Sequence, residues 1–358
     1  MTNKNIKLFF CFIVLPALFV ACKKNNDKID DFASKYKYPI PAVKLSKDAI
    51  VGAYYSNYTS TDWNKAQPDT SLLGKPYDAI NNPDILPQQM NFADEGGVDY
   101  LILKWNAAAA DNSLLNAFAS ARTNQKVKMV IDYNTAHLKA TNAAPLKGTT
   151  LKTMLNELTS LVQGHISKDY YFKIGDRPVI LLSPINLSSS ALTSIDYKYV
   201  TDTLRTELKK QGINPFFIGE LTTGWAAPVN YDATALAAMD AIVLTSWNTP
   251  DYDRWWAFYS FVDLSYQNWK KSLEQMNVQY VPCIFPGYNE PSAATQRIID
   301  RTDSNYVDYC NVAKRSMGKD QLVIINSWND FSRGTALEPS LKYNKQFLQI
   351  TKREFKVQ

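Results

Sequence analysis

Residues 98–105 read Val98-Asp99-Tyr100-Leu101-Ile102-Leu103-Lys104-Trp105, and this apolar run begins the stretch that decides the fold. A helical pattern from Asn112 to Thr123 follows it. A second run then reads Val127-Lys128-Met129-Val130-Ile131-Asp132-Tyr133. Both runs are nearly continuous in apolar residues, as strands buried on both faces are. We therefore expect a parallel strand, a helix and a second parallel strand here.

The same alternation extends over most of the chain. Further helical patterns cover 151–167, 199–211, 260–276 and 305–317. The eight strand-like runs are 50–55, 98–105, 127–133, 177–182, 215–219, 241–246, 279–285 and 321–326. Eight strands alternating with helices predict a single-domain α/β fold, the closed (β/α)8 TIM barrel. An open doubly wound sheet is the alternative, and it is weakened because no Gly-rich phosphate loop follows any run.

The N-terminus has the features of a bacterial targeting signal. Lys4 and Lys7 precede an apolar stretch, residues 8–20, which is too short for a comfortable membrane span. Ala21 and Cys22 follow, as at a lipoprotein cleavage site. A plain cleaved signal and an uncleaved anchor are the alternatives, and each places the protein outside the cytoplasm.

These features divide the chain into three expected parts. Residues 1–22 form the lipoprotein signal peptide, with Cys22 as the lipidated residue. Residues 23–45 form a polar tether, and residues 46–358 form the barrel. We expect a lipid-anchored protein of the bacterial cell envelope, with the membrane as a partner through its N-terminal lipid. Whether it faces the periplasm or the cell exterior stays open.

Composition excludes several classes of function. The net charge is +5, and no dense Lys/Arg cluster is interleaved with aromatic residues, so we expect no nucleic-acid partner. With only His137 and His165, and no Cys/His spacing, we expect no metal and no cofactor, although oxygen ligands stay open. Cys283 and Cys310 are expected to be small buried residues rather than a disulfide.

The strand ends indicate a ligand site. In such barrels the site lies at the carboxyl ends of the strands. Aromatic rings stack on sugar faces, while amides and carboxylates bind sugar hydroxyls. We therefore predict a site for a polysaccharide or oligosaccharide, although each Asp or Asn here is also a residue type that caps helices. The predicted binding residues are Tyr54, Tyr55, Lys104, Trp105, Asp132, Tyr133, Glu220, Trp247, Tyr288, Asn289, Trp328, Asn329, Arg333 and Glu338.

The last of these segments carries a family resemblance. Residues 326–340 read NSWNDFSRGTALEPS. They resemble a motif of the family 99 glycoside hydrolases, the endo-α-mannosidase-like barrels, and of barrel relatives linked to surface polysaccharides. That motif runs Ser-x-Asn-Glu-Trp-His-Glu-Gly-Thr-x-Ile-Glu-Pro. Three further segments, residues 52–55, 173–179 and 285–289, resemble family segments in the same order, so the resemblance covers nearly the whole mature domain. The related family 71 barrels share this overall pattern.

Two motif positions depart from the family. The resemblance implies a catalytic pair of Glu residues, the first a base toward the sugar 2-hydroxyl and the second a general acid. Here Asp330 stands at the first position and Arg333 at the second. Arginine has no practical proton to give, because its pKa stays above roughly 12. The family mechanism therefore cannot be transferred unchanged.

Three interpretations remain. In the first, the chain is an endo-acting glycoside hydrolase on an α-linked polysaccharide, with Asp330 and a relocated acid as its catalytic residues. Glu290, which follows the seventh run, is the preferred acid, ahead of Glu220, Asp132 and Glu338. In the second, the protein binds glycan without cleaving it. In the third, Arg333 pairs with the carboxylate or sulfate of an acidic polysaccharide.

Some of these residues also have simpler explanations. Arg333 has the alternative of a salt bridge with Glu338 or Asp330, and Glu338 has that of tying its own loop to backbone amides. His137, after the third run, is placed within reach of the mouth. His165, late in a helical pattern, is expected to pack or cap. Two carboxylates facing each other across the mouth would favour catalysis over binding.

Overall fold

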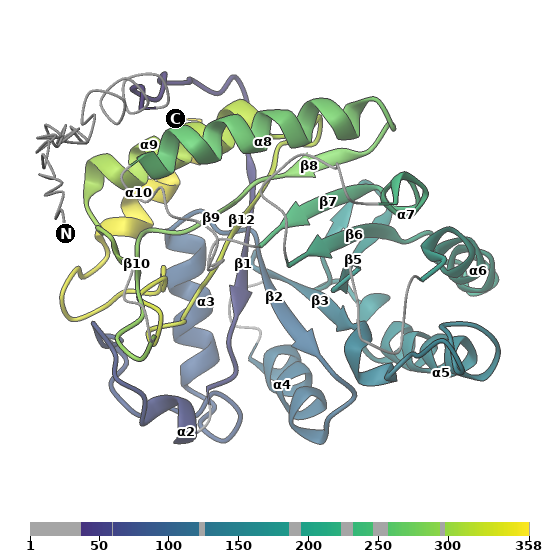
Figure 1. Ribbon diagram of the computed structural model, residues 1–358. Coiled ribbons are helices and arrows are strands. Elements are labelled where there is room, and N and C mark those ends of the chain that lie inside the picture. The colour runs from purple at the N-terminus through teal and green to yellow at the C-terminus, as the bar shows by residue number, and fades with distance from the viewer. Residues whose placement is uncertain are drawn as a thin grey trace, which may run out of the picture.

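A computed structural model describes residues 37–58, 60–121, 126–185, 195–222, 232–245, 257–293 and 298–357. The strands form one ring in the order β8-β7-β6-β5-β3-β2-β1-β12-β9, and the helices surround it (Figure 1). All pairs along this path are parallel. The predicted (β/α)8 barrel is confirmed.

Each expected run became a strand of the ring. The strands are β1 Ile50–Tyr55, β2 Tyr100–Trp105, β3 Lys128–Asn134, β5 Arg177–Ser183, β6 Phe216–Leu221, β7 Ala241–Leu244, β8 Gln279–Val281, β9 Cys283–Ile284 and β12 Leu322–Ile325. Pro282, which has no N–H for a strand ladder, divides the seventh run into β8 and β9. The ring closes there, because β8 pairs with β7 while β9 pairs with β12.

The helices follow their strands as the alternation requires. The predicted helices are confirmed as α4 Ala109–Ser120, α5 Gly148–Leu161, α6 Tyr197–Lys209, α8 Phe258–Glu274 and α9 Asp303–Ser316. A π-helical turn, Val162–Ile166, continues α5. Asp196 caps α6 by accepting a hydrogen bond from the Tyr199 N–H, and Gly212, at a φ of 75°, turns the chain after it. Sequence analysis missed α2 Ser60–Trp63, α3 Ile85–Glu95, α7 Ala233–Ala237 and α10 Gln346–Phe355.

Two short hairpins decorate the barrel. One pairs β4 Lys173–Ile174 with the start of β5. The other, β10 Tyr288–Asn289 with β11 Ile298–Ile299, follows β9 and extends the chain beyond the strand end. The second hairpin matters for the site, because Glu290 directly follows β10.

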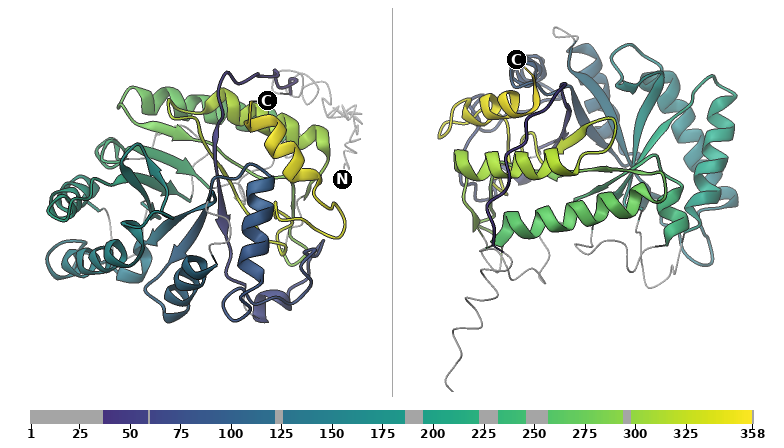
Figure 2. Two further views of the ribbon diagram at one scale, coloured as in Figure 1. Left: turned by 180° about the vertical axis from the view of Figure 1, so that it is seen from behind. Right: turned by 90° about the horizontal axis from the view of Figure 1, so that it is seen from above.

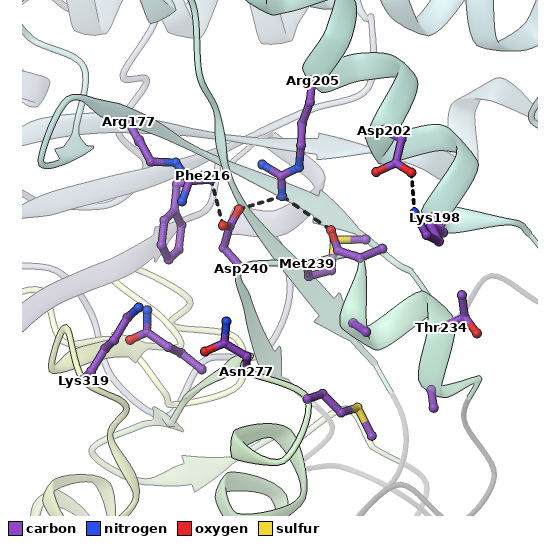
Figure 3. Close-up of a pocket in the computed structure, with 15 residues that line it drawn as sticks. Arg177, Lys198, Asp202, Arg205, Phe216, Thr234, Met239, Asp240, Asn277 and Lys319 are labelled. Atoms are coloured by element: carbon purple, nitrogen blue, oxygen red, sulfur yellow. Dashed lines mark hydrogen bonds and ion pairs between the residues drawn. The ribbon is translucent and has the colours of Figure 1, made fainter.

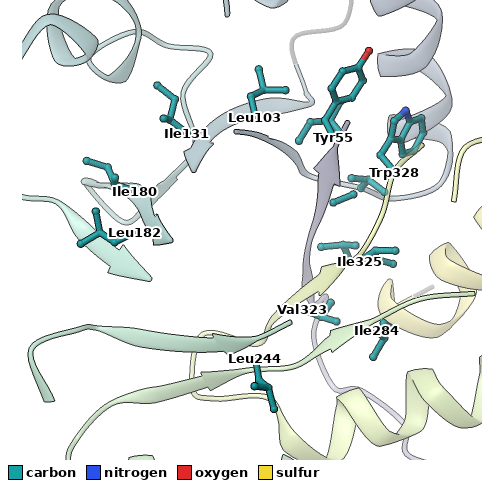
Figure 4. Packing of buried hydrophobic residues seen from close by; sticks show 14 of the residues in the cluster. Tyr55, Leu103, Ile131, Ile180, Leu182, Leu244, Ile284, Val323, Ile325 and Trp328 are labelled. Carbon is teal, nitrogen blue, oxygen red and sulfur yellow. The ribbon is translucent and has the colours of Figure 1, made fainter. Parts of the chain in front are cut away.

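Side chains alternate between two apolar layers on the strands. One face of each strand packs against the helices, and Figure 4 shows residues of this outer layer, among them Leu103, Ile131, Leu182 and Ile325. The other face fills the barrel lumen. The lumen cluster contains Tyr100, Ile102, Val130, Val179, Leu181, Phe216, Ile218, Ala241, Val243, Val281, Cys283, Leu322 and Ile324.

The barrel body begins earlier in the chain than expected. Residues 37–45 were predicted as part of the tether, but they pack on the helices. The Tyr38 hydroxyl donates to Asp263 on α8 at 2.7 Å, and the Val43 N–H donates to Asn311 on α9 at 3.1 Å. Ile40 between them is 9% exposed. This segment, residues 37–45, is called the strap below; it crosses α9 from one end of α8 (Figure 2).

The membrane predictions concern another part of the chain. Cys22 and the signal peptide lie outside the described residues. Among the described residues, none of the helices combines the length and apolar character that crossing a bilayer requires.

Candidate functional site

The upper lumen of the barrel is polar. Lys104, Asp132 and Glu220 each stand two positions beyond an inward residue of their strand, near its carboxyl end. Tyr54 stands four positions beyond Ile50 on β1, on the same face. Because strand side chains alternate, these four face the lumen at the mouth. We call them, with Thr245 after β7, the polar layer. They lie together at the end where sites of such barrels form.

Two carboxyl groups of the polar layer are close enough to perturb each other. Asp132 on β3 is 2% exposed. Burial raises its pKa to about 8, and the charge of Glu220 adds to this effect, while a hydrogen bond with Ser183 and the charge of Lys104 oppose it. Burial also raises the pKa of Glu220 on β6. At neutral pH the pair therefore holds a proton.

The hydrogen bonds of the two groups differ. Glu220 accepts from the Tyr54 hydroxyl at 2.8 Å and from the Thr245 hydroxyl at 2.9 Å, one donor on each oxygen. The Asp132 Oδ1 atom is buried and has no hydrogen-bond partner within the described part of the chain. Lys104, paired in register with Asp132, is exposed on the neighbouring strand.

A second cluster lies on the loop after β12. Asp330 is a half-buried carboxylate whose Oδ1 accepts from the Ser332 hydroxyl at 2.7 Å, the Tyr58 hydroxyl at 3.1 Å and the Arg333 N–H at 3.2 Å. Its own N–H donates to Ser327 Oγ at 2.6 Å. These bonds fix the carboxylate and leave Oδ2 directed at the Arg333 side chain.

Arg333 stands between two carboxylates. Its Nε atom is 3.8 Å from Asp330 Oδ2 and 4.0 Å from Glu290 Oε1. The Tyr288 hydroxyl donates to the other oxygen of Glu290 at 2.7 Å. Asp330, Glu290 and Arg333 line one hollow of about 270 Å³ together with Ser56, Asn57, Tyr58, Asp62, Lys65, Ser292 and Ser332. Of the two alternative partners expected for Arg333, the structure has Asp330 and not Glu338.

Three buried residues of the 326–340 motif hold the loop after β12 in place. Asn329 is fully buried and holds the backbone of Ser56, accepting from its N–H at 2.7 Å and donating to its carbonyl at 2.9 Å. Trp328 is fully buried in the core. Glu338 is fully buried too, and accepts from Tyr77 at 2.8 Å and Gln89 at 3.1 Å. These three were expected to bind ligand, but burial keeps them from the mouth, and Glu338 ties the loop to other side chains instead.

Three more expected binding residues face the helices. Tyr55 is 4% exposed and donates to Gln89 at 2.9 Å. Trp105 is 5% exposed and donates to Asn112 at 2.9 Å. Tyr133 is fully buried and donates to Glu157. Each directly follows an inward residue, so alternation turns it outward, and we exclude all three from the candidate site.

The remaining expected residues fall into two groups. Tyr288 and Asn289 lie on the β10 strand beside the Asp330 loop, where the Asn289 N–H donates to the Arg333 carbonyl at 2.9 Å. Trp247 lies outside the described residues. His137 does not enter the polar layer, because its Nε2 is 3.0 Å from Glu157 on α5.

Sequence analysis missed Tyr58 and Thr245 as site residues. Thr245 had a usable signal, since it stands two positions beyond the inward Val243. Tyr58 had a weaker one, its place three residues after β1. Its hydroxyl also accepts from the Ser332 N–H at 3.0 Å, so it joins the β1 end to the Asp330 loop.

A larger hollow, of about 770 Å³, lies at the opposite end of the barrel. There Asp240 pairs with Arg177 at 2.7 Å and with Arg205 at 2.8 Å (Figure 3). It also accepts from the Phe217 N–H at 2.9 Å. The hollow is lined by more cations than carboxylates, and Asp240 binds two of its arginines. In barrels of this kind, this end serves stability rather than chemistry. We therefore place the candidate site at the mouth.

Other chemistry is sparse in the described ranges. No group of three or more His, Cys, Asp or Glu side chains there is placed to hold a metal ion. Cys283 and Cys310 are free, buried thiols, as expected.

Comparisons with known proteins agree with this geometry. Residues 66–351 match the protein family described as Glycosyltransferase WbsX. A solved "Glycoside hydrolase-like protein" is similar over 90% of this chain and 98% of its own, with a TM-score of 0.78 and 22% identity. The GH99 endo-alpha-mannosidase from Bacteroides thetaiotaomicron is similar over 86% of this chain and 97% of its own, with a TM-score of 0.61 and 17% identity. These likenesses confirm the family 99-like barrel. No curated protein matches.

Proposed function

This chain belongs to the WbsX glycosyltransferase family, and on that premise we propose that it is a glycoside hydrolase acting on a polysaccharide. The specific form we propose is endo-acting cleavage of an α-linked glycan. The α linkage and the endo action draw support from the motif around Asp330 and from the similar endo-alpha-mannosidase barrel.

One observation carries the proposal. Asp330 Oδ2 and Glu290 Oε1 lie no more than about 8 Å apart, since both distances end on Arg333 Nε. Glycosidases use two carboxyl groups roughly 5–10 Å apart, one on each side of the scissile bond. The second carboxylate that hydrolysis requires is therefore available in the same hollow as the first.

The roles follow from the surroundings of each group. Asp330 is held as an acceptor by three donors, so it suits the base that acts on the sugar or on a water. Glu290, which is bound by Tyr288 and lies beyond strand β9, would protonate the leaving oxygen. Arg333 would bind hydroxyl or acidic groups of the glycan as a hydrogen-bond donor.

The family name raises transfer from a nucleotide sugar as a competing activity. Such a donor carries a diphosphate, which Gly-rich loops, cations or a metal bind. The described mouth does hold the cations Lys65, Lys104 and Arg333, but five carboxyl groups oppose their charge and would repel a diphosphate. These are Asp62, Asp132, Glu220, Glu290 and Asp330. Transfer of a glycosyl group to a sugar acceptor in place of water remains compatible with the same pair.

The second candidate is a glycan-binding protein without catalysis. The observation that favours it is the pairing of Arg333 with both carboxylates, because a carboxylate engaged in an ion pair is a poor proton donor. In either case we propose that the protein is secreted and anchored by a lipid on Cys22 in the cell envelope. This rests on the N-terminal sequence.

Product release tests the proposal. The chain from residue 23 onward is incubated with neutral and acidic polysaccharides of α and β linkage, beside Asp330→Asn, Glu290→Gln and the control Asp202→Asn on the outer helix α6. We expect oligosaccharides with the wild type and the control, and at least a roughly 100-fold lower rate with either site variant. Binding without products from any glycan would overturn hydrolysis and favour the second candidate.

A further inference from the structure

The polar layer is a second group of charged side chains, apart from the Asp330 hollow. None of its members lines that hollow. It combines Asp132 and Glu220, two carboxyl groups in the lumen, with one cation, Lys104. When both carboxyl groups are ionised, the layer lacks one positive charge.

The carboxyl oxygens of the layer can also accept more hydrogen bonds than its own donors supply. Asp132 is 2% exposed, and its Oδ1 atom is buried without a partner among the described residues. Each Glu220 oxygen accepts one hydrogen bond from the protein and has room for another. A buried acceptor without a donor is costly, so a ligand that donates here gains the energy of satisfying it.

We propose that the polar layer binds the ammonium group of an amino sugar, so that the glycan recognised at this mouth contains hexosamine units with a free amine. An ammonium brings three donors and the missing positive charge. A sugar hydroxyl brings one donor and no charge, which leaves two carboxylates opposed by a single lysine. A metal ion would have only two carboxyl ligands from this layer, and hard cations take six or more oxygen ligands.

The environment of Asp132 agrees with such a ligand. Burial and Glu220 raise the pKa of Asp132 to about 8, so at pH 7 the empty layer balances its charge with a proton. In the described part of the chain, the charged or titratable groups that face this carboxyl are Lys104 on β2, Glu220 on β6 and Tyr54 on β1. Cys283 on β9 borders Glu220. An ammonium that takes the place of the proton would release it to solvent.

Calorimetric titration with two matched oligosaccharides tests this inference. The probes are a glucosamine oligomer with free amines and its N-acetylated counterpart, added at pH 6.5–7 to the chain from residue 23 onward. We expect the free-amine oligomer to bind at least tenfold more tightly. We also expect release of close to one proton for each bound amine, once the protons that the amines of the probe themselves take up at that pH are subtracted. The net number comes from titrations in buffers of different ionisation enthalpy, and the uptake by the amines comes from a pH titration of the free probe.

Isosteric variants test whether the preference for the free-amine oligomer arises from the polar layer. Asp132→Asn and Glu220→Gln each remove one negative charge, and each should weaken the free-amine oligomer at least tenfold while changing the N-acetylated one less than twofold. Asp202→Asn, which removes an exposed carboxylate at the other end of the barrel, should change neither. Circular dichroism and thermal melting establish whether each variant is folded. If a variant does not fold, the proton release measured with the wild type tests the inference instead.

Three results would overturn the inference. The wild type could bind the two probes with equal affinity, or the Asp132→Asn and Glu220→Gln variants could lose equal affinity for both probes. Calcium could also compete with the free-amine oligomer for the site. The inference rests on the proposed function only in that the ligand is a glycan. Amine-dependent binding without cleavage of any polysaccharide would refute hydrolysis alone. Cleavage of a glycan without amine-dependent binding would refute the amino-sugar inference alone.

Discussion

Asp132 shows how one residue makes stability depend on pH. Folding moves this carboxyl group from water to the lumen and raises its pKa to about 8, well above its usual range. The folded state therefore holds the proton more tightly than the unfolded chain does. The resulting stability is fully present below roughly pH 4, where both states are protonated, and is lost as pH rises toward 8.

We predict that Asp132→Asn raises the melting temperature by a few degrees at pH 8 and changes it little at pH 4. At about pH 4 the group is largely neutral in the folded state and close to its ordinary pKa in the unfolded state, so it resembles the amide, whereas at pH 8 the amide avoids the cost of the buried carboxyl group. Differential scanning calorimetry at both pH values measures the difference. A fall in melting temperature at pH 8 would contradict this account.

The types of residue at the strand ends could be predicted from the sequence. Which of two adjacent side chains faces the mouth was not predicted. Tyr54 and Tyr55, or Lys104 and Trp105, are adjacent, and both members of each pair were assigned to the site. The first of each pair faces the mouth and the second packs against helices. Strict alternation from inward residues such as Ile102 would have separated them. The burial of Glu338 had no such local signal, because its donors come from residues 71–89, far away in sequence.

At the scale of elements, one carboxylate connects several strands and a helix at the end of the barrel opposite the mouth. Asp240, before β7, binds Arg177 at the start of β5, Arg205 of α6 and the backbone of Phe217 on β6. Removing it would leave two partly buried guanidinium groups and one N–H without this acceptor. Four elements would lose a shared contact.

We predict that Asp240→Ala lowers the free energy of unfolding by about 1–3 kcal/mol, a value reduced for the partial exposure of the arginines. Asp202→Ala, whose carboxylate is 58% exposed, should stay within about 0.5 kcal/mol of the wild type. Urea unfolding followed by circular dichroism gives both values. Glycan binding should be unchanged in both variants, since the mouth lies at the other end; weaker binding in Asp240→Ala would argue against this separation.

Sequence periodicity located the strands better than the helices. The apolar runs are short and continuous, and each became a strand of the ring. The helix α3 was missed because Pro87 lies within it, although a proline is tolerated in a first turn. The helix α10 was missed at the C-terminal end of the chain. Its alternation of Phe347, Leu348, Ile350 and Thr351 with charged residues is nevertheless helical, and those four are buried.

For the whole molecule, the strap sets where the folded body begins. Tyr38 binds Ser260 and Asp263 on α8, and the carbonyl of Val43 accepts from Lys314 on α9 at 2.9 Å. Ile40 is packed between these contacts, and burying a side chain of this size contributes about 1.5–3 kcal/mol. Although outside the repeating strand-helix pattern, the strap is part of the barrel's outer layer.

We predict that a chain starting at residue 46 melts several degrees lower than a chain starting at residue 37, because it loses these hydrogen bonds and the burial of Ile40. A chain starting at residue 37 should melt close to one starting at residue 23, since it keeps every strap contact. Thermal melting of the three chains compares them. Equal values for all three would show that the strap adds no stability.

The strap also determines at which end of the barrel an N-terminal attachment would join the folded body. It begins at the first turn of α8, the helix that follows β7, and such helices start at the end of the barrel where the mouth opens. If Cys22 carries a lipid, that attachment joins the folded body at the end of the barrel where the mouth opens. The mouth, rather than the Asp240 end, is then the end of the barrel nearer to the point where the chain leaves for the membrane.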